Sequence, residues 1–131
     1  MDHDEFIGHV QHRARLDSRG AAEQTTRATL ETLAERLAGG EPKDLAAQLP
    51  DEIGRHLRRT EAAQESFSLQ DFYQRVAERS APGVGLPDAA FHAKAVLSVV
   101  RDAVSPGQFD HLVAQLPDEY RDLLAYDEAT S

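Results

Sequence analysis

The hexapeptide AQLPDE occurs twice in this chain of 131 residues, at residues 47–52 and again at residues 114–119. A shift of 67 residues carries the first copy onto the second, and the same shift aligns residues 22–57 with residues 89–124 without a gap. Self-similarity over a fixed distance indicates a structural module that is present more than once. We therefore interpret the hexapeptide as a joint that every copy of this module needs.

The hydrophobic pattern of each copy is typical of helices. Upstream of the first alignment, residues 4–14 match residues 70–80 at a shift of 66 residues. No window shows the alternation of a β-strand. A stripe at i, i+4, i+8, i+11 and i+15 occurs in both copies, as Ala22, Thr26, Leu30, Leu33 and Leu37 and as Ala89, Ala93, Leu97, Val100 and Val104. The sequence therefore predicts an all-α fold built from a duplicated four-helix module, with about eight helices in total.

The length of the repeat also predicts the domain organisation. We expect one all-helical domain over residues 1–131, made of repeat one at residues 2–60 and repeat two at residues 67–126. A module of about 60 residues is near the lower limit for folding alone. The two copies are therefore expected to share one core, with approximate two-fold pseudosymmetry.

Local signals agree with helix starts at the expected places. The proline of the hexapeptide has a fixed φ, and the two acids after it suit the positive end of a helix dipole. We expect this proline at the first helical position and the preceding helix to end at Gln48 or Gln115, because the residue before a proline is disfavoured in the α region. Capping pairs at N-cap and N3 spacing are Asp2 with Glu5 and Ser68 with Asp71.

Composition restricts the classes of partner. The chain has 23 acids, 14 bases and no cysteine, which gives a net charge of −9. Phosphate backbones and anionic membrane surfaces repel such a chain at long range. No apolar stretch is long enough to span a bilayer, and the acidic start MDHDEFIGHV is unlike a signal peptide. We expect a cytoplasmic protein, monomer or homodimer, that binds an unknown protein partner but neither nucleic acid, membrane nor cofactor.

One group of side chains has the composition of a metal site. Glu5, His9 and His12 fall at i, i+4 and i+7, so a helix places them on one face. Imidazole and carboxylate groups are ligands for zinc, nickel or copper. The second copy has no histidine at the corresponding positions. A solvent-exposed face is the simpler interpretation, and metal binding is the alternative.

The other polar candidates favour a structural interpretation. His92 and His111 are either partly buried or ordinary surface histidines, and His56 lies near a predicted helix end. The acids of each hexapeptide are adjacent on a helix, so they point about 100° apart and do not share a site. The sequence has no nucleophile elbow and no phosphate-binding glycine loop. A non-catalytic role is therefore favoured over an enzyme.

With the repeated AQLPDE, the helix pair RATLETLAERL and KAVLSVVRDAV, and the openings DEFIGHV and QDFYQRV, the chain resembles the bacterial family known as domain of unknown function 2267. The resemblance implies an all-helical, duplicated, prokaryotic protein and carries no activity, cofactor or catalytic residue. We expect a small soluble bacterial protein that acts as a protein-interaction module. The alternatives are a metal-binding protein that uses Glu5, His9 and His12, and a ligand carrier or enzyme with a pocket between the two repeats.

Overall fold

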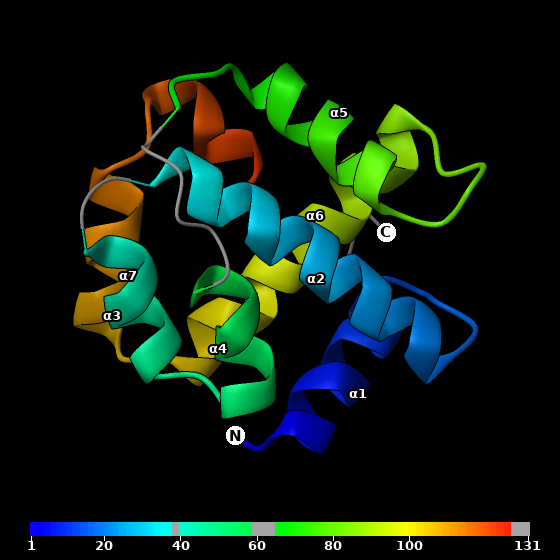
Figure 1. Ribbon diagram of the computed structural model, residues 1–131, viewed down its shortest axis with the longest axis horizontal. Coiled ribbons are helices and arrows are strands. Elements are labelled where there is room, and N and C mark those ends of the chain that lie inside the picture. The colour runs from blue at the N-terminus through cyan, green and yellow to red at the C-terminus, as the bar shows by residue number, and fades with distance from the viewer. Residues whose placement is uncertain (38–39, 59–64, 127–131) are drawn as a thin grey trace.

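The computed structural model describes residues 1–37, 40–58 and 65–126. In these ranges the chain forms seven α-helices, one 3-10 helix and no strand (Figure 1), which confirms the all-α prediction. The predicted end of repeat one at residue 60 lies outside these ranges. In chain order the helices are α1 His3–Arg13, α2 Arg19–Arg36, α3 Glu41–Ala47, α4 Asp51–Arg58, α5 Leu69–Arg79, α6 Leu86–Ala103, α7 Pro106–Ala114 and the 3-10 helix η1 Asp118–Asp122.

The predicted caps form at the start of α1 and α5. The backbone N–H of Glu5 donates to Asp2 Oδ1 at 2.8 Å, and the Glu5 side chain accepts from the Asp2 N–H at 3.3 Å. This reciprocal pair is a capping box. Ser68 Oγ accepts from the N–H of Asp71 at 3.1 Å. Both pairs satisfy backbone donors that a helix start leaves without a partner.

The helices before the two hexapeptide prolines end where the sequence predicts. α3 ends at Ala47 with Gln48 as its C-cap, and α7 ends at Ala114 with Gln115 as its C-cap. Each of these caps is the second residue before a proline. The chain therefore leaves the helix before it meets the restricted position that precedes the ring.

The predicted position of the prolines is wrong by one residue. Pro117 is the N-cap of η1, with φ −61° and ψ 160°, so its backbone is extended rather than helical. Pro50 also lies just before its helix, and its carbonyl accepts from the N–H groups of Ile53 at 2.9 Å and Gly54 at 2.8 Å. The first helical residue is in each case the aspartate. A proline suits this cap because a residue there needs no hydrogen bond from its own N–H.

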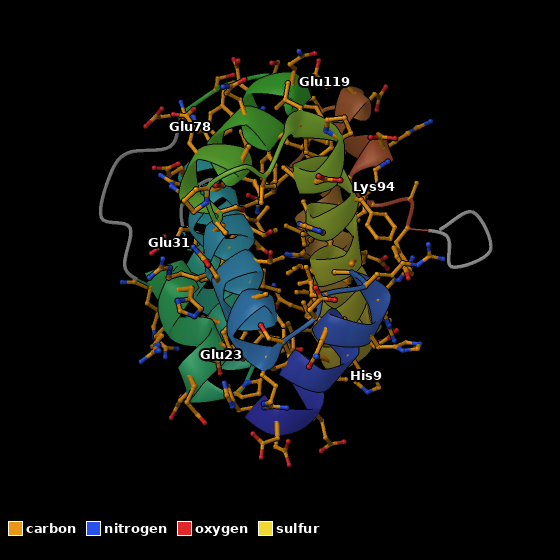
Figure 2. The ribbon with its side chains drawn as sticks, turned by 90° about the vertical axis from the view of Figure 1, so that its right-hand side faces the viewer. His9, Glu23, Glu31, Glu78, Lys94 and Glu119 are labelled. Carbon is orange, nitrogen blue, oxygen red and sulfur yellow. The ribbon has the colours of Figure 1, made fainter. Side chains whose placement is uncertain are left out.

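The two long helices, α2 and α6, contact each other at the centre of the fold, and α1 and α5 each pack against both. α4 covers α2, while α3 contacts α4 and α7 (Figure 1). Figure 2 shows the side chains of α2 and α6 filling the space between them. In the described ranges no helix is long and apolar enough to cross a bilayer. The largest core side chains include Phe6, Leu30, Phe72, Leu97 and Tyr120.

Helix α2 buries more polar side chains than its apolar stripe suggests. Thr26, Thr29 and Thr32 are fully buried, and Thr25 is 4% exposed. Thr32 Oγ1 donates to the carbonyl of Ala28, one turn earlier, at 2.8 Å. This bond satisfies the hydroxyl of Thr32, whereas the buried hydroxyls of Thr26 and Thr29 have no hydrogen-bond partner in the described ranges. α2 is therefore enclosed on more sides than its apolar residues alone predict.

Candidate functional site

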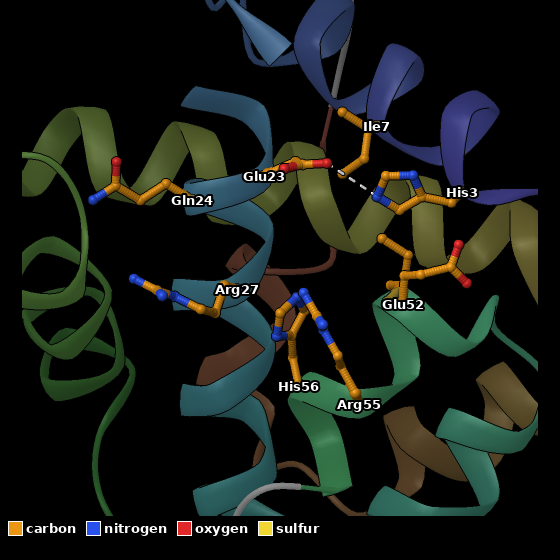
Figure 3. A pocket seen from close by; sticks show the side chains of 9 residues that line it. His3, Ile7, Glu23, Gln24, Arg27, Glu52, Arg55 and His56 are labelled. Atoms are coloured by element: carbon orange, nitrogen blue, oxygen red, sulfur yellow. Dashed lines mark ion pairs between the residues drawn. The ribbon is translucent and has the colours of Figure 1, made fainter. Parts of the chain in front are cut away.

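Three helices of the first half surround a pocket with a volume of about 250 Å³, which we call the α1–α2–α4 pocket (Figure 3). The lining residues are His3 and Ile7 of α1, Glu23, Gln24 and Arg27 of α2, and Glu52, Ile53, Arg55 and His56 of α4. All three helices lie within repeat one as the sequence defines it. The pocket is therefore not between the two repeats, where the ligand-carrier alternative placed it.

The floor of the pocket is apolar. Ile7 and Ile53 line it and are each 1% exposed, because both also belong to the hydrophobic core. His56 is 7% exposed and brings an imidazole to the same depth. The pocket thus ends on packed side chains, which leave a ligand little apolar surface to cover.

One side of the pocket is closed by an ion pair. His3 Nε2 lies 3.0 Å from Glu23 Oε1, and His3 Nδ1 lies 3.4 Å from Asp4 Oδ1. Asp4 also accepts from Arg19 Nη2 at 3.0 Å. The start of α1 is in this way connected to the first turns of α2. Figure 3 shows Glu23 reaching toward His3 across the top of the pocket.

Three other charged residues that line the pocket have no internal partner within the described ranges. Arg27, Arg55 and Glu52 are exposed and line the pocket. Within the described ranges none of the three takes part in a hydrogen bond or an ion pair. Figure 3 shows Arg55 and His56 rising together from α4, while the carboxylate of Glu52 points away from them. The guanidinium groups of Arg27 and Arg55 therefore have no internal partner in the described part of the chain, and Figure 3 shows the Arg27 side chain extending away from Arg55.

The aligned positions of the second half have different side chains that contact each other. Tyr73 stands at the position of Ile7, Lys94 at that of Arg27 and Asp122 at that of Arg55. Tyr73 Oη donates to Asp122 Oδ2 at 2.7 Å, and Lys94 Nζ lies 3.1 Å from Asp122 Oδ1. The hydrogen bond from Tyr73, with a smaller effect of Lys94, lowers the pKa of Asp122 against the opposing effect of burial.

At the position of His56 the second half has Leu123, which is fully buried. Tyr120, also fully buried, stands at the position of Ile53 and donates from its hydroxyl to the Phe67 carbonyl at 2.8 Å. Tyr73 and Lys94 of the second half are thus both bonded to Asp122, whereas Arg27 and Arg55 of the first half line the pocket without an internal partner in the described ranges. The different residue types at these positions are visible in the two aligned segments of sequence, whereas their contacts are not.

The predicted metal-ligating residues lie on α1. Glu5 is committed to the capping box, and His9 and His12 are exposed. Across the part of the chain that the structure describes, no group of three or more His, Cys, Asp or Glu side chains is arranged to hold a metal ion. Metal binding by these residues stays a prediction. Calorimetric titration of zinc into the wild type and a His9→Ala/His12→Ala variant tests it.

The remaining candidate residues, two histidines and the hexapeptide acids, lie at different places in the fold. The His111 side chain is 79% exposed, as expected of a surface histidine. His92 is half-buried instead, and burial lowers its pKa despite the nearby charge of Asp88. The hexapeptide acids are exposed and begin their helices, and Glu119 also accepts from the Leu69 N–H at 2.6 Å. Helix capping accounts for these acids without a catalytic role.

A polar cluster between α3 and α7 was missed from the sequence. The Glu41 side chain is 3% exposed and accepts from Gln108 Nε2 at 2.7 Å and from Gln115 Nε2 at 3.2 Å. Gln48 Nε2 donates to Gln108 Oε1 at 3.4 Å. Burial raises the pKa of Glu41, although the Gln108 hydrogen bond and the charge of His111 oppose it. Glu41 aligns with Gln108, and Gln48 aligns with Gln115, so a comparison of the two repeats would have drawn attention to these polar residues.

Comparison with known proteins gives a family and no activity. The model of the family described as "Uncharacterized conserved protein (DUF2267)" matches residues 3–123. This range includes every residue of the α1–α2–α4 pocket and of the α3–α7 cluster. Among curated proteins, none matches this chain. The match covers most of the sequence, and the chain therefore belongs to the DUF2267 family.

Proposed function

We propose that this protein is a non-catalytic binding module whose binding site is the α1–α2–α4 pocket. The observation that carries the proposal is the contrast between the two halves. Tyr73 and Lys94 both bond to Asp122 in the second half, whereas Arg27 and Arg55, which align with Lys94 and Asp122, have no partner within the described ranges. Charges left without internal partners around a pocket are suited to an external one.

A duplicated origin, with one shared core and approximate two-fold pseudosymmetry, is part of this proposal. Two ion pairs at aligned positions support it. Arg13 Nη2 lies 2.6 Å from Asp102 Oδ2, and Arg79 Nη2 lies 2.7 Å from Glu35 Oε2. Each pair joins the first helix of one half to the second helix of the other half. After duplication, one copy is free to hold the fold together while the other keeps a binding site.

The size of the pocket supports binding of a small group. Pockets for drug-sized ligands usually have volumes of about 300 Å³ or more. A pocket of about 250 Å³ suits a very small molecule or the end group of a partner protein. An interaction module of this kind needs no cofactor. The proposal also includes the expectation from the sequence that this is a bacterial protein of the cytoplasm.

A variant with a filled pocket tests the proposal. The substitutions Ile7→Tyr and Arg55→Asp copy the bonded pair Tyr73–Asp122 of the second half into the first. Backbone amide NMR spectra of the wild type and this variant are recorded with a library of small acids, amines and neutral compounds. We expect compounds that shift the amide signals of α1, α2 and α4 in the wild type and leave the filled variant unchanged.

Two further variants make the result decisive. Val113→Tyr adds a tyrosine at an exposed position of α7, away from the pocket, and should bind as the wild type does. If the filled variant does not fold, Arg27→Gln/Arg55→Gln replaces it, because both side chains are exposed. A library in which no compound distinguishes the wild type from either pocket variant overturns the proposal.

A further inference from the structure

We propose that Glu52 is a latch that closes the α1–α2–α4 pocket by accepting a hydrogen bond from the backbone N–H of His3 at the start of α1. Both residues line the pocket, Glu52 from α4 and His3 from α1. The proposal rests on the proposed function and adds regulation of that same site. It is drawn from the second half of the chain, where the corresponding residues form this bond.

In the second half, an acid of the hexapeptide connects η1 to the start of α5. Glu119 Oε1 accepts from the backbone N–H of Leu69, the first residue of α5, at 2.6 Å. A helix start leaves this N–H without an intrahelical partner, and the helix dipole favours a carboxylate there. Tyr120 adds a second connection, because its hydroxyl lies 2.8 Å from the carbonyl oxygen of Phe67 and 3.2 Å from that of Ser68. η1 is therefore fixed against the start of α5.

The first half has the same two groups, but they are not joined. Glu52 stands at the position of Glu119. His3 is the first residue of α1, as Leu69 is of α5. Within the described ranges, neither the Glu52 carboxylate nor the His3 N–H has a hydrogen-bond partner. Figure 3 shows Glu52 below His3, with its carboxylate on the side away from Arg55. This connection between α4 and α1 is therefore not made, and the pocket is open between them.

The charge at the start of α1 accounts for the open state. Asp2, Asp4 and Glu5 are exposed acids in the cap and first turn of α1. The corresponding positions of α5 hold a single acid, Asp71. Like charges in one place oppose each other. A carboxylate from α4 therefore meets more repulsion at α1 than one from η1 meets at α5, and removing acids from the start of α1 should favour the closed state.

Backbone amide NMR spectra of the full chain at neutral pH test the latch, because the proton shift of an amide changes when its N–H donates to a carboxylate. Glu119→Gln gives the reference effect on the Leu69 amide, since it replaces the carboxylate that this N–H meets in the structure. Glu52→Gln should move the His3 amide signal in the same direction by a smaller amount. Asp51→Asn is the control for a distant change of charge, because the Asp51 side chain is 96% exposed on the same turn of α4.

A second background tests the control by charge. Asp2→Asn/Glu5→Gln removes two negative charges from the start of α1 and keeps the capping groups, because asparagine and glutamine serve the same capping positions. In this background we expect Glu52→Gln to move the His3 amide signal about two- to fivefold further than in the wild type. Measuring one substitution in two backgrounds cancels the direct effect of the cap changes on His3.

The outcomes separate the latch from the proposed function. A His3 amide signal that Glu52→Gln leaves unchanged in both backgrounds overturns the latch, and so does one that Asp51→Asn moves equally far. An effect of equal size in the two backgrounds overturns the control by charge. None of these measurements uses a ligand, so their failure leaves the proposed function untouched. If the His3 signal responds as expected while no compound binds the pocket, the proposed function is overturned instead, and the latch is only a connection within the fold.

Discussion

Glu41 is a single residue whose charge affects the stability of the whole fold. Its side chain is buried between α3 and α7, and burial raises its pKa above the ordinary value of 4.5, against the hydrogen bond from Gln108 and the charge of His111. A raised pKa means that the folded state holds this proton more tightly than the unfolded state does. The contribution of Glu41 to stability therefore falls as the pH rises from 4.5 through the folded-state pKa.

Replacing this carboxyl with an amide should remove that dependence on pH. We expect Glu41→Gln to gain stability relative to the wild type as the pH rises through the window above 4.5, with no such trend below it. Urea denaturation at a series of pH values measures the difference. Glu78→Gln is the control, because Glu78 is exposed on α5. A difference between Glu41→Gln and the wild type that is constant over the whole range would contradict the prediction.

Single residues were predicted well from the sequence where the cause was local. The capping pairs Asp2 with Glu5 and Ser68 with Asp71 form because both partners lie within one turn of the backbone. Glu41 was missed because its burial depends on Gln108, which is distant in the sequence. The polarity of a side chain predicts exposure only when no second helix supplies its hydrogen bonds.

At the scale of elements, the contact between α3 and α4 depends on one glycine. A Cβ atom at Gly54 would lie 2.7 Å from the carbonyl oxygen of Ala46 and 3.3 Å from its Cα atom. The hexapeptide turns the chain so that the two helices approach this closely. In the second half Arg121 stands at the aligned position, and the same hexapeptide opens a 3-10 helix instead of an α-helix. The shared hexapeptide thus predicts the bend, while Gly54 determines how closely α3 and α4 pack.

Gly54→Ala should therefore force α3 and α4 apart. We expect a loss of about 1–3 kcal/mol in the free energy of unfolding, which is typical of overpacking in a tight site. Gly8→Ala is the matched control, because a Cβ atom at that position of α1 would meet no other atom within 4 Å. The control should gain about 0.5–1 kcal/mol, since alanine is the better helix former. Urea denaturation compares the two, and a Gly54→Ala protein as stable as the wild type would refute the tight contact.

For the whole molecule, periodicity and capping signals predicted the helical class and the ends of most helices, because these depend on neighbours in sequence. The α1–α2–α4 pocket was not predicted. It arises where His3, Glu23 and Arg55 from three helices meet, and the hydrophobic pattern of each helix is the same whether such a space is open or filled. Differences between aligned positions, such as Tyr73 for Ile7 and Asp122 for Arg55, are the signal that the sequence holds.

The two cross-half ion pairs give a prediction about how the halves hold together. Glu35 is 17% exposed and Asp102 is 48% exposed, although the two stand at aligned positions. Burial tends to raise the pKa of Glu35, but the hydrogen bonds and charges of Arg79 and Arg75 outweigh it, so its pKa is lowered. The stability from this ion pair is present above pH 4.5, the ordinary pKa of the carboxyl, and is lost as the pH falls through the folded-state pKa.

Replacing the arginine should therefore lower the free energy of unfolding more at the Arg79–Glu35 pair, whose carboxylate is the less exposed of the two. We expect Arg79→Met to reduce the free energy of unfolding by about 1–3 kcal/mol at neutral pH, because it leaves a partly buried carboxylate with fewer partners. Arg13→Met removes a pair whose carboxylate is more exposed, together with a hydrogen bond of 3.1 Å to Ser98 Oγ, so it should cost about 1 kcal/mol, less than Arg79→Met. Urea denaturation of both variants at neutral and acidic pH measures these costs. The Arg79→Met deficit should shrink in acid as Glu35 is protonated, and a deficit independent of pH would assign the loss to packing of the arginine stem instead.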